Sequence, residues 1–155
     1  MRTKNEILLK FLFPQYSQPC ESRFLKSFNK TRNKKNKNET ETHSYKISLD
    51  KIMNGEDKRT TIIIKNIPNN ITKENINEIL YGVGNFNFLY LPYDKYKKKN
   101  LGFAFVNMIN YRSIIYLFNK LINYQFETIE MKNNIEICYS KIQGKVSLRK
   151  MLEKH

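Results

Sequence analysis

The residues with the clearest chemical potential are two phenylalanines, Phe103 and Phe105, in the segment Leu101–Met108 with the sequence LGFAFVNM. Side chains alternate across a β-strand, so both rings share one face of a predicted strand, while Ala104 and Val106 occupy the other. The smaller residues suit packing against helices, which leaves the two rings on an open face. Exposed aromatic rings are costly unless something flat stacks on them, and nucleobases are flat. The alternative is a buried strand with its rings in the core.

A second strand is predicted upstream, where Thr61–Pro68 has the sequence TIIIKNIP and is rich in β-branched residues. Asn66 and Pro68 end it, because both residue types favour turns. The two strands resemble RNP1 and RNP2, the paired central strands of the RNA recognition motif (RRM). Ile63 stands where RNP2 is usually aromatic, so the resemblance implies a flat aliphatic contact at that position.

Two helices are predicted from apolar residues that recur at helical spacing. The first follows Thr72, a good N-cap residue, and ends at Gly82. The second follows Asn110, which is also suited to cap a helix. The expected inward positions are Ile76, Ile79, Leu80 and Val83 in the first helix, and Ile114, Ile115, Phe118, Leu121 and Ile122 in the second.

Two further strands complete the predicted order. Residues 86–91 form one, with Phe88 and Tyr90 on the face of the two Phe rings, and residues 135–139 form the last. A polar loop with four lysines, DKYKKKN, lies at 94–100. The order βαββαβ is the ferredoxin-like pattern of the α+β class. It predicts a four-stranded antiparallel sheet with both helices on one face and the other face open.

Four stretches narrow the resemblance to the C-terminal RRM of the Mei-two-like family, which are RNA-binding proteins associated with meiosis and development. They are Ile62–Asn69, Phe86–Asp94, Leu101–Met108 and, most discriminating, KIQGK at Lys141–Lys145. The resemblance runs from about Arg59 to the C-terminus. It implies that the tail after the last strand belongs to the domain as a third helix.

These observations predict three regions. Residues 1–58 form a mostly disordered, basic, Asn- and Lys-rich N-terminal region, with the polar linker TRNKKNKNETET at Thr31–Thr42. Residues 59–142 form the RRM, and residues 143–155 form its helical extension. Whether this extension covers the sheet as a gate or packs at its edge stays open.

We expect bases to stack on the open sheet face and lysines to contact phosphates. The chain has 28 Lys and Arg against 14 Asp and Glu, a net charge of +14 that attracts polyphosphates. A solvated basic surface would give the same charge, so charge alone does not decide. The expected RNA-binding residues are Ile63, Lys65, Asn66, Tyr90, Phe103, Phe105, Asn107, Tyr139 and Lys141, with the loop lysines Lys97, Lys98 and Lys99.

The predicted function is single-stranded RNA binding, in post-transcriptional or meiotic and developmental regulation as the resemblance implies. The alternative is an RRM-like protein–protein interaction module that holds a peptide instead of RNA. Ile63 and Leu101, which replace the usual RNA-contacting residue types, keep that alternative open.

Catalysis is not expected, and neither are a cofactor, a metal or a small-molecule substrate. Cys20 and Cys138 are far apart, and His43 and His155 lie in segments predicted to be flexible, so no metal-ligand spacing exists. A nucleophile with a base, paired carboxylates and a Gly-rich phosphate loop are all missing from the pattern.

The N-terminal segment indicates where in the cell the protein is expected to be. Ile7–Phe13 is apolar but much shorter than the roughly 20 residues that span a bilayer. It also lacks the cleavage site of a secretory signal, so we expect an intracellular protein, nuclear or cytoplasmic, without a membrane partner. A mitochondrial presequence and a short partner-binding helix both stay open for this segment. The run Lys34–Lys37 is a weak nuclear-import signal.

Overall fold

The structure, a computed structural model, describes residues 45–124, 126 and 134–153. The predictions for Ile7–Phe13, Thr31–Thr42, Lys34–Lys37, Cys20 and His43 lie outside the described residues, as does the one for His155.

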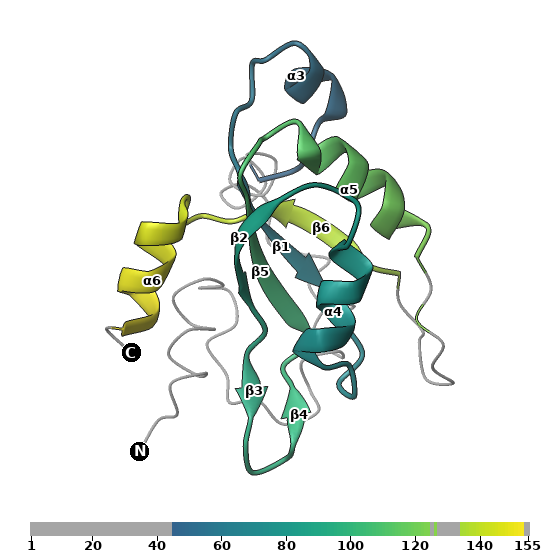
Figure 1. Ribbon diagram of the computed structural model, residues 1–155, viewed down its shortest axis with the longest axis vertical. Helices are drawn as coiled ribbons and strands as arrows, with labels where there is room; N and C mark the ends of the chain where they lie inside the picture. The colour runs from purple at the N-terminus through teal and green to yellow at the C-terminus, as the bar shows by residue number, and fades with distance from the viewer. Residues whose placement is uncertain (1–44, 125, 127–133, 154–155) are drawn as a thin grey trace, which may run out of the picture.

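The described residues contain a four-stranded antiparallel sheet in the order β2-β5-β1-β6. Its strands are β1 (Thr61–Lys65), β2 (Phe86–Tyr90), β5 (Phe103–Met108) and β6 (Glu136–Tyr139). Helices α4 (Lys73–Leu80) and α5 (Ser113–Ile122) both cover one face of this sheet (Figure 1). The predicted βαββαβ order and ferredoxin-like α+β fold are therefore confirmed.

The main core lies between the sheet and these two helices. Ile62 and Ile64 of β1, with Ala104 and Val106 of β5, are buried there, as strand alternation predicts. The predicted positions Ile76, Ile79 and Leu80 of α4 are buried as well, and so is Val83, which lies in the turn after the helix instead of within it. In the second helix the buried residues are Ile114, Leu117 and Leu121.

The prediction that Ile122 faces the core is wrong, because its side chain is 48 % exposed and the sequence pattern missed Leu117 instead. Counting from Ile114 in steps of three and four brings Leu117 and Leu121 to the buried stripe. Ile122 then falls one residue beyond that stripe, on the side turned to solvent.

Thr72 caps α4 as predicted, but the prediction that Asn110 caps the second helix is wrong, because the N-cap of α5 is Arg112 and its side chain makes no capping hydrogen bond. The Thr72 hydroxyl accepts a hydrogen bond from the Asn75 backbone N–H at 3.2 Å, and the Asn75 side-chain oxygen accepts one from the Thr72 N–H at 3.0 Å. This reciprocal pair is a capping box. Before α5, the Asn110 side-chain oxygen accepts from the Arg112 N–H at 2.9 Å and supports the turn that leads into the helix.

Part of the region expected to be disordered packs on the domain. Residues 45–58 contain the short helix α3 (Leu49–Met53), and Ile47 and Ile52 are buried in the main core. The Tyr139 N–H donates to the Tyr45 carbonyl at 2.8 Å, beside an antiparallel bridge between Lys46 and Cys138. Two buried isoleucines in so short a segment give no clear periodicity, so the sequence pattern did not reveal this packing.

The lysine-rich stretch at 94–100 is part of a hairpin instead of the expected open loop. Strands β3 (Tyr93–Asp94) and β4 (Lys99–Asn100) pair, and the hairpin projects beyond the end of the sheet (Figure 1). The Asp94 carboxylate accepts from the backbone N–H groups of Tyr96 and Lys97 at 2.9 and 3.1 Å and shapes the turn. We call residues 93–100 the basic hairpin.

The last described element, α6 (Lys145–Glu153), lies across the sheet from α4 and α5 (Figure 1). The face that was expected to be open is therefore occupied by a helix. Within the described part of the chain, every helix is too short or too polar to cross a bilayer.

Candidate functional site

The sheet face opposite α4 and α5 carries a second apolar cluster. Phe105 stands between Ile63 on β1 and Tyr90 on β2 in the strand register. The rings of Phe103 and Phe105 meet edge to face, with centroids 5.8 Å apart and planes at 88°. We call these residues, together with Phe88, the platform. Their shared face confirms the predicted alternation of the three strands.

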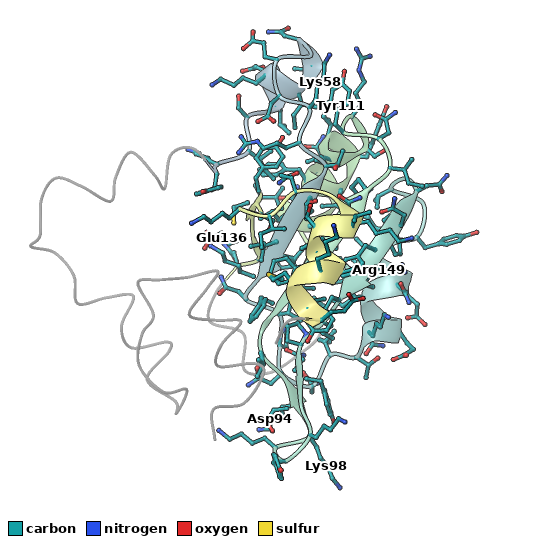
Figure 2. All side chains as sticks on the ribbon, turned by 90° about the vertical axis from the view of Figure 1, so that its left-hand side faces the viewer. Lys58, Asp94, Lys98, Tyr111, Glu136 and Arg149 are labelled. Carbon is teal, nitrogen blue, oxygen red and sulfur yellow. The ribbon has the colours of Figure 1, made fainter. Side chains whose placement is uncertain are left out.

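The platform is covered in this structure. Phe103 is 3 % exposed and Phe105 is 0 % exposed, so the expectation that both rings face solvent is wrong for this conformation. Leu148 and Met151 of α6 are buried in the same cluster. Figure 2 shows α6, with Arg149 on it, in front of the sheet. Rings that stand on the sheet face can still be sealed by a segment distant in sequence, which strand alternation cannot reveal.

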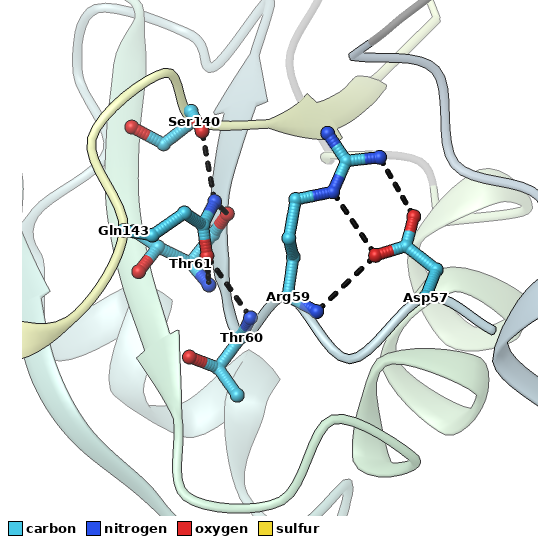
Figure 3. A network of polar contacts seen from close by, with 6 residues as sticks. All are labelled: Asp57, Arg59, Thr60, Thr61, Ser140 and Gln143. Atoms are coloured by element: carbon cyan, nitrogen blue, oxygen red, sulfur yellow. Dashed lines mark hydrogen bonds and ion pairs between the residues drawn. The ribbon is translucent and has the colours of Figure 1, made fainter. Parts of the chain in front are cut away.

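Gln143 determines where the tail leaves the sheet. Its side-chain oxygen accepts from the N–H groups of Thr60 and Thr61 at 3.1 and 2.9 Å. Its side-chain nitrogen donates to the carbonyls of Thr61 and Ser140, both at 2.8 Å (Figure 3). One side chain thus ties the start of β1 to the end of β6. The glutamine of the KIQGK stretch therefore has a structural role, because it fixes the point at which the tail leaves the sheet.

Gly144 then turns the chain back over the platform. Its φ of +88° lies in the left-handed region, which favours glycine. Its N–H donates to the Thr61 hydroxyl at 2.8 Å. Helix α6 begins at the next residue, Lys145, so the direction of the helix is set by this short turn.

Two expected base-reading amides are engaged within the protein. The Asn107 side-chain oxygen accepts from the hydroxyls of Thr60 and Thr61 at 3.0 and 2.6 Å, and its nitrogen donates to the Asn87 side chain at 2.8 Å. The Asn66 side chain donates to the Asn134 carbonyl at 2.8 Å, from a backbone φ of +61°. Both amides therefore hold loops and strand ends in place in this conformation.

Tyr139 lies on the helix side of the sheet, so the expectation that it extends the platform is wrong. The Arg59 guanidinium stacks over its ring, 3.9 Å from the centroid. The same guanidinium forms a 2.7 Å ion pair with Asp57 (Figure 3). Burial, with the nearby Asp57 carboxylate, raises the pKa of Tyr139 to about 12. Strand alternation gives the reason, because Tyr139 shares the face of Ile137 while Cys138 takes the platform side.

Lys65 lies at the edge of the platform, opposite Phe103 in the strand register. Its ammonium group forms a 3.1 Å ion pair with Glu136. Burial lowers the pKa of Lys65, but the neighbouring Cys138 sulfur and the Glu136 carboxylate outweigh burial and hold this pKa above its usual value. Burial also raises the pKa of the Cys138 thiol. Lys65 therefore stays charged beside the rings, as a phosphate contact requires.

The remaining predicted lysines lie on exposed parts of the molecule. Lys141 is exposed just after β6, and Lys97, Lys98 and Lys99 are exposed on the basic hairpin together with Lys95. The hairpin also carries Tyr96, whose side chain is 94 % exposed and which the sequence pattern did not single out. The available signal was the interleaving of this aromatic residue with lysines in DKYKKKN. In Figure 2, Lys98 lies at the opposite end of the molecule from Lys58.

The platform, together with Lys65, Lys141 and the lysines of the basic hairpin, provides flat apolar rings and positive charges. Among the described residues, no three His, Cys, Asp or Glu side chains gather in a way that could hold a metal ion. The chemistry available at this face is stacking and charge neutralisation of an elongated anion with planar groups.

Comparison with known proteins gives a family match over residues 59–153, to the family described as RNA recognition motif 2. Protein MEI2-like 5 of Arabidopsis thaliana is 39 % identical over 116 residues, which cover 73 % of this chain and 14 % of the relative. Protein MEI2-like 4 of the same plant is 35 % identical, covering 76 % and 13 %. Protein MEI2-like 5 of Oryza sativa subsp. japonica is 37 % identical, covering 67 % and 12 %. The chain thus spans about one seventh of these relatives or less.

Solved structures similar to this chain include the Rna15 RRM with bound RNA (GU), at a TM-score of 0.49 and 20 % identity. That match covers 61 % of this chain and 97 % of the other. RNA recognition domains 1 and 2 of Sex-lethal from Drosophila melanogaster match at a TM-score of 0.45 and 16 % identity, covering 52 % and 48 %.

Proposed function

Because this chain belongs to the RNA recognition motif 2 family, we propose that it binds single-stranded RNA through the sheet face that carries the platform. The observation that supports this most is the position of the rings. The main core is complete on the helix side of the sheet, yet Phe88, Tyr90, Phe103 and Phe105 gather on the other side. Flat rings gathered on that face suit base stacking.

In the proposed complex, bases stack on Phe103 and Phe105, with Tyr90 extending the surface and Ile63 offering a flat aliphatic contact. Lys65, Lys141 and the hairpin lysines Lys97, Lys98 and Lys99 neutralise phosphates. Asn66 and Asn107 reach base edges only if they exchange their present protein partners for RNA. We place this activity in post-transcriptional regulation inside the cell, in meiotic or developmental control as the Mei-two-like resemblance implies.

A second candidate function is supported by α6 itself. Its buried side chains Leu148 and Met151 show that the platform accepts the apolar side of an amphipathic helix. The same face would accept a helical peptide from another protein in the same way. Peptide binding becomes the leading function if the full chain fails to bind RNA at low salt even when α6 is destabilised by Leu148→Ala.

Replacing Phe103 by leucine tests the stacking role. Leucine keeps an apolar side chain under α6 but removes the flat ring. A base stack contributes roughly 1–3 kcal/mol, so we expect RNA affinity to fall by about tenfold, which corresponds to about 1.4 kcal/mol. Fluorescence anisotropy of the full chain with a degenerate single-stranded RNA pool measures this. Phe118→Leu, on the helix side of the sheet, is the matched control and should bind like the wild type. Equal affinities for both variants and the wild type would remove the platform from the RNA site.

The basic hairpin should determine much of the salt dependence. Each phosphate contact to a single strand contributes about 0.7 to the slope of log affinity against log salt concentration, so Lys98→Ala/Lys99→Ala should lower the slope by about 1.4. Lys51→Ala/Lys58→Ala removes the same charge from α3 and the segment after it, at the end of the molecule opposite the hairpin (Figure 1), and should change the slope much less. Identical slopes for both pairs would show that the lysines act only through net charge.

A further inference from the structure

We propose that α6 is a lid that must leave the platform before bases can stack there. This inference rests on the proposed RNA-binding function and adds its regulation: the free chain holds its own RNA site closed. Leu148 is 0 % exposed and packs with Met151 against Ile63, Phe103 and Phe105. A base cannot reach either ring while these two side chains are in place.

The lid has one fixed end. The hydrogen bonds that attach the tail to the sheet converge on Gln143 and Gly144, immediately before the helix. Helix α6 itself meets the platform through apolar side chains. Apolar contacts are not directional, so they can be exchanged for stacked bases without leaving buried polar groups unpaired. The attachment therefore allows the helix to leave by unwinding the left-handed turn at Gly144 while Gln143 stays in place.

The lid is also a short, amphipathic helix. It has nine residues, below the roughly 12–15 at which isolated helices become marginally stable in water. Its helical form therefore depends on the platform it covers. Its outward side presents Val146, Arg149 and Lys150 to solvent. Two of these are cations, so the outer side of the closed lid attracts the same polyanion that the platform beneath it would bind.

A closed lid lowers the apparent RNA affinity by the fraction of molecules that are open. Leu148→Ala removes apolar contact between lid and platform, so it should tighten RNA binding by about tenfold in the full chain. Val146→Ala, an equally conservative change on the exposed side of α6, should leave affinity unchanged. Gly144→Ala provides a second opening variant that keeps every apolar contact, because it strains only the left-handed turn.

Amide hydrogen exchange of residues 145–153 tests displacement directly. Bound RNA usually slows exchange at its site, whereas a displaced lid should exchange faster in the saturated complex than in the free chain. Faster exchange together with tighter binding by Leu148→Ala and Gly144→Ala supports the proposal. Unchanged protection of α6 in the saturated complex, with equal affinity of both variants and the wild type, overturns the lid but leaves RNA binding intact. Failure of the wild type and both opening variants to bind RNA overturns the proposed function itself, and the lid with it.

Discussion

Replacing Gln143 by alanine should reduce the free energy of unfolding by about 2–4 kcal/mol, because it orphans backbone groups that are shielded from water. The side chain makes four hydrogen bonds, to the N–H groups of Thr60 and Thr61 and to the carbonyls of Thr61 and Ser140. Thr61 and Ser140 are buried, so water cannot easily replace the lost partners. Urea denaturation followed by circular dichroism measures the change.

Two variants separate this effect from a general disturbance of the turn. Gln143→Glu keeps an oxygen for the two N–H groups but places a second oxygen against two carbonyls, so it should recover only part of the lost stability. Lys141→Ala alters an exposed residue of the same turn and should change the unfolding free energy by less than about 0.5 kcal/mol. An unchanged urea midpoint for Gln143→Ala would show that the turn does not depend on this side chain.

Replacing Phe105 by alanine should cost about 3–5 kcal/mol of stability, the range for deleting a fully buried ring. Phe105 is sealed between Ile63, Tyr90 and the Phe103 ring beneath α6. An alanine substitution intended to abolish base stacking would therefore also weaken the fold. For this reason leucine, which keeps apolar volume, is the better probe of RNA contact. Thermal and urea unfolding of the full chain measure the loss.

A double-mutant cycle shows whether α6 contributes to that burial. Phe105→Ala and Leu148→Ala should couple by about 0.5–3 kcal/mol, as contacting residues do. If the stability losses of the two single variants add up to that of the double variant, Leu148 does not contact the Phe105 ring. Tyr116→Ala, which removes an exposed aromatic side chain from α5, should change stability by less than about 0.5 kcal/mol.

The helices and strands of the domain could be predicted from the sequence because each depends on local spacing. Strand alternation placed Phe103 and Phe105 opposite Ala104 and Val106, and helical spacing gave the buried positions of α4. The match to the RNA recognition motif 2 family and the identities with MEI2-like proteins confirm the resemblance drawn from the four stretches.

The exposure of the platform could not be predicted in the same way. Periodicity tells which residues share a face, but not what covers that face. The covering residues, Leu148 and Met151, stand more than forty positions after Phe103 in the chain. The amphipathic pattern of α6 was visible, yet it fits equally well with packing at the sheet edge. Only the turn at Gln143 and Gly144 decides between the two, and its hydrogen bonds join residues about eighty positions apart.

The present hydrogen-bond partners of the polar site residues could not be predicted either, for a related reason. Asn107 was expected to read bases from its place on the strand, but Thr60 and Thr61 already bind its side chain. Hydrogen bonding between distant residues leaves no periodic signal in a single sequence. Tyr139 is different. It lies two residues after Ile137 on the same strand, so strand alternation alone is enough to place it on the helix side.

The pairing of residues 45–46 with β6 has a consequence for how the domain is isolated. This segment occupies the outer edge of β6, where the Tyr139 N–H finds the Tyr45 carbonyl. A fragment that begins at Arg59, where the family match begins, would leave that edge with unpaired backbone groups and lose Ile47 and Ile52 from the core. Unpaired edges are templates for strands of other molecules. Such a fragment would be prone to self-association, and titrations with it would report aggregation alongside RNA binding.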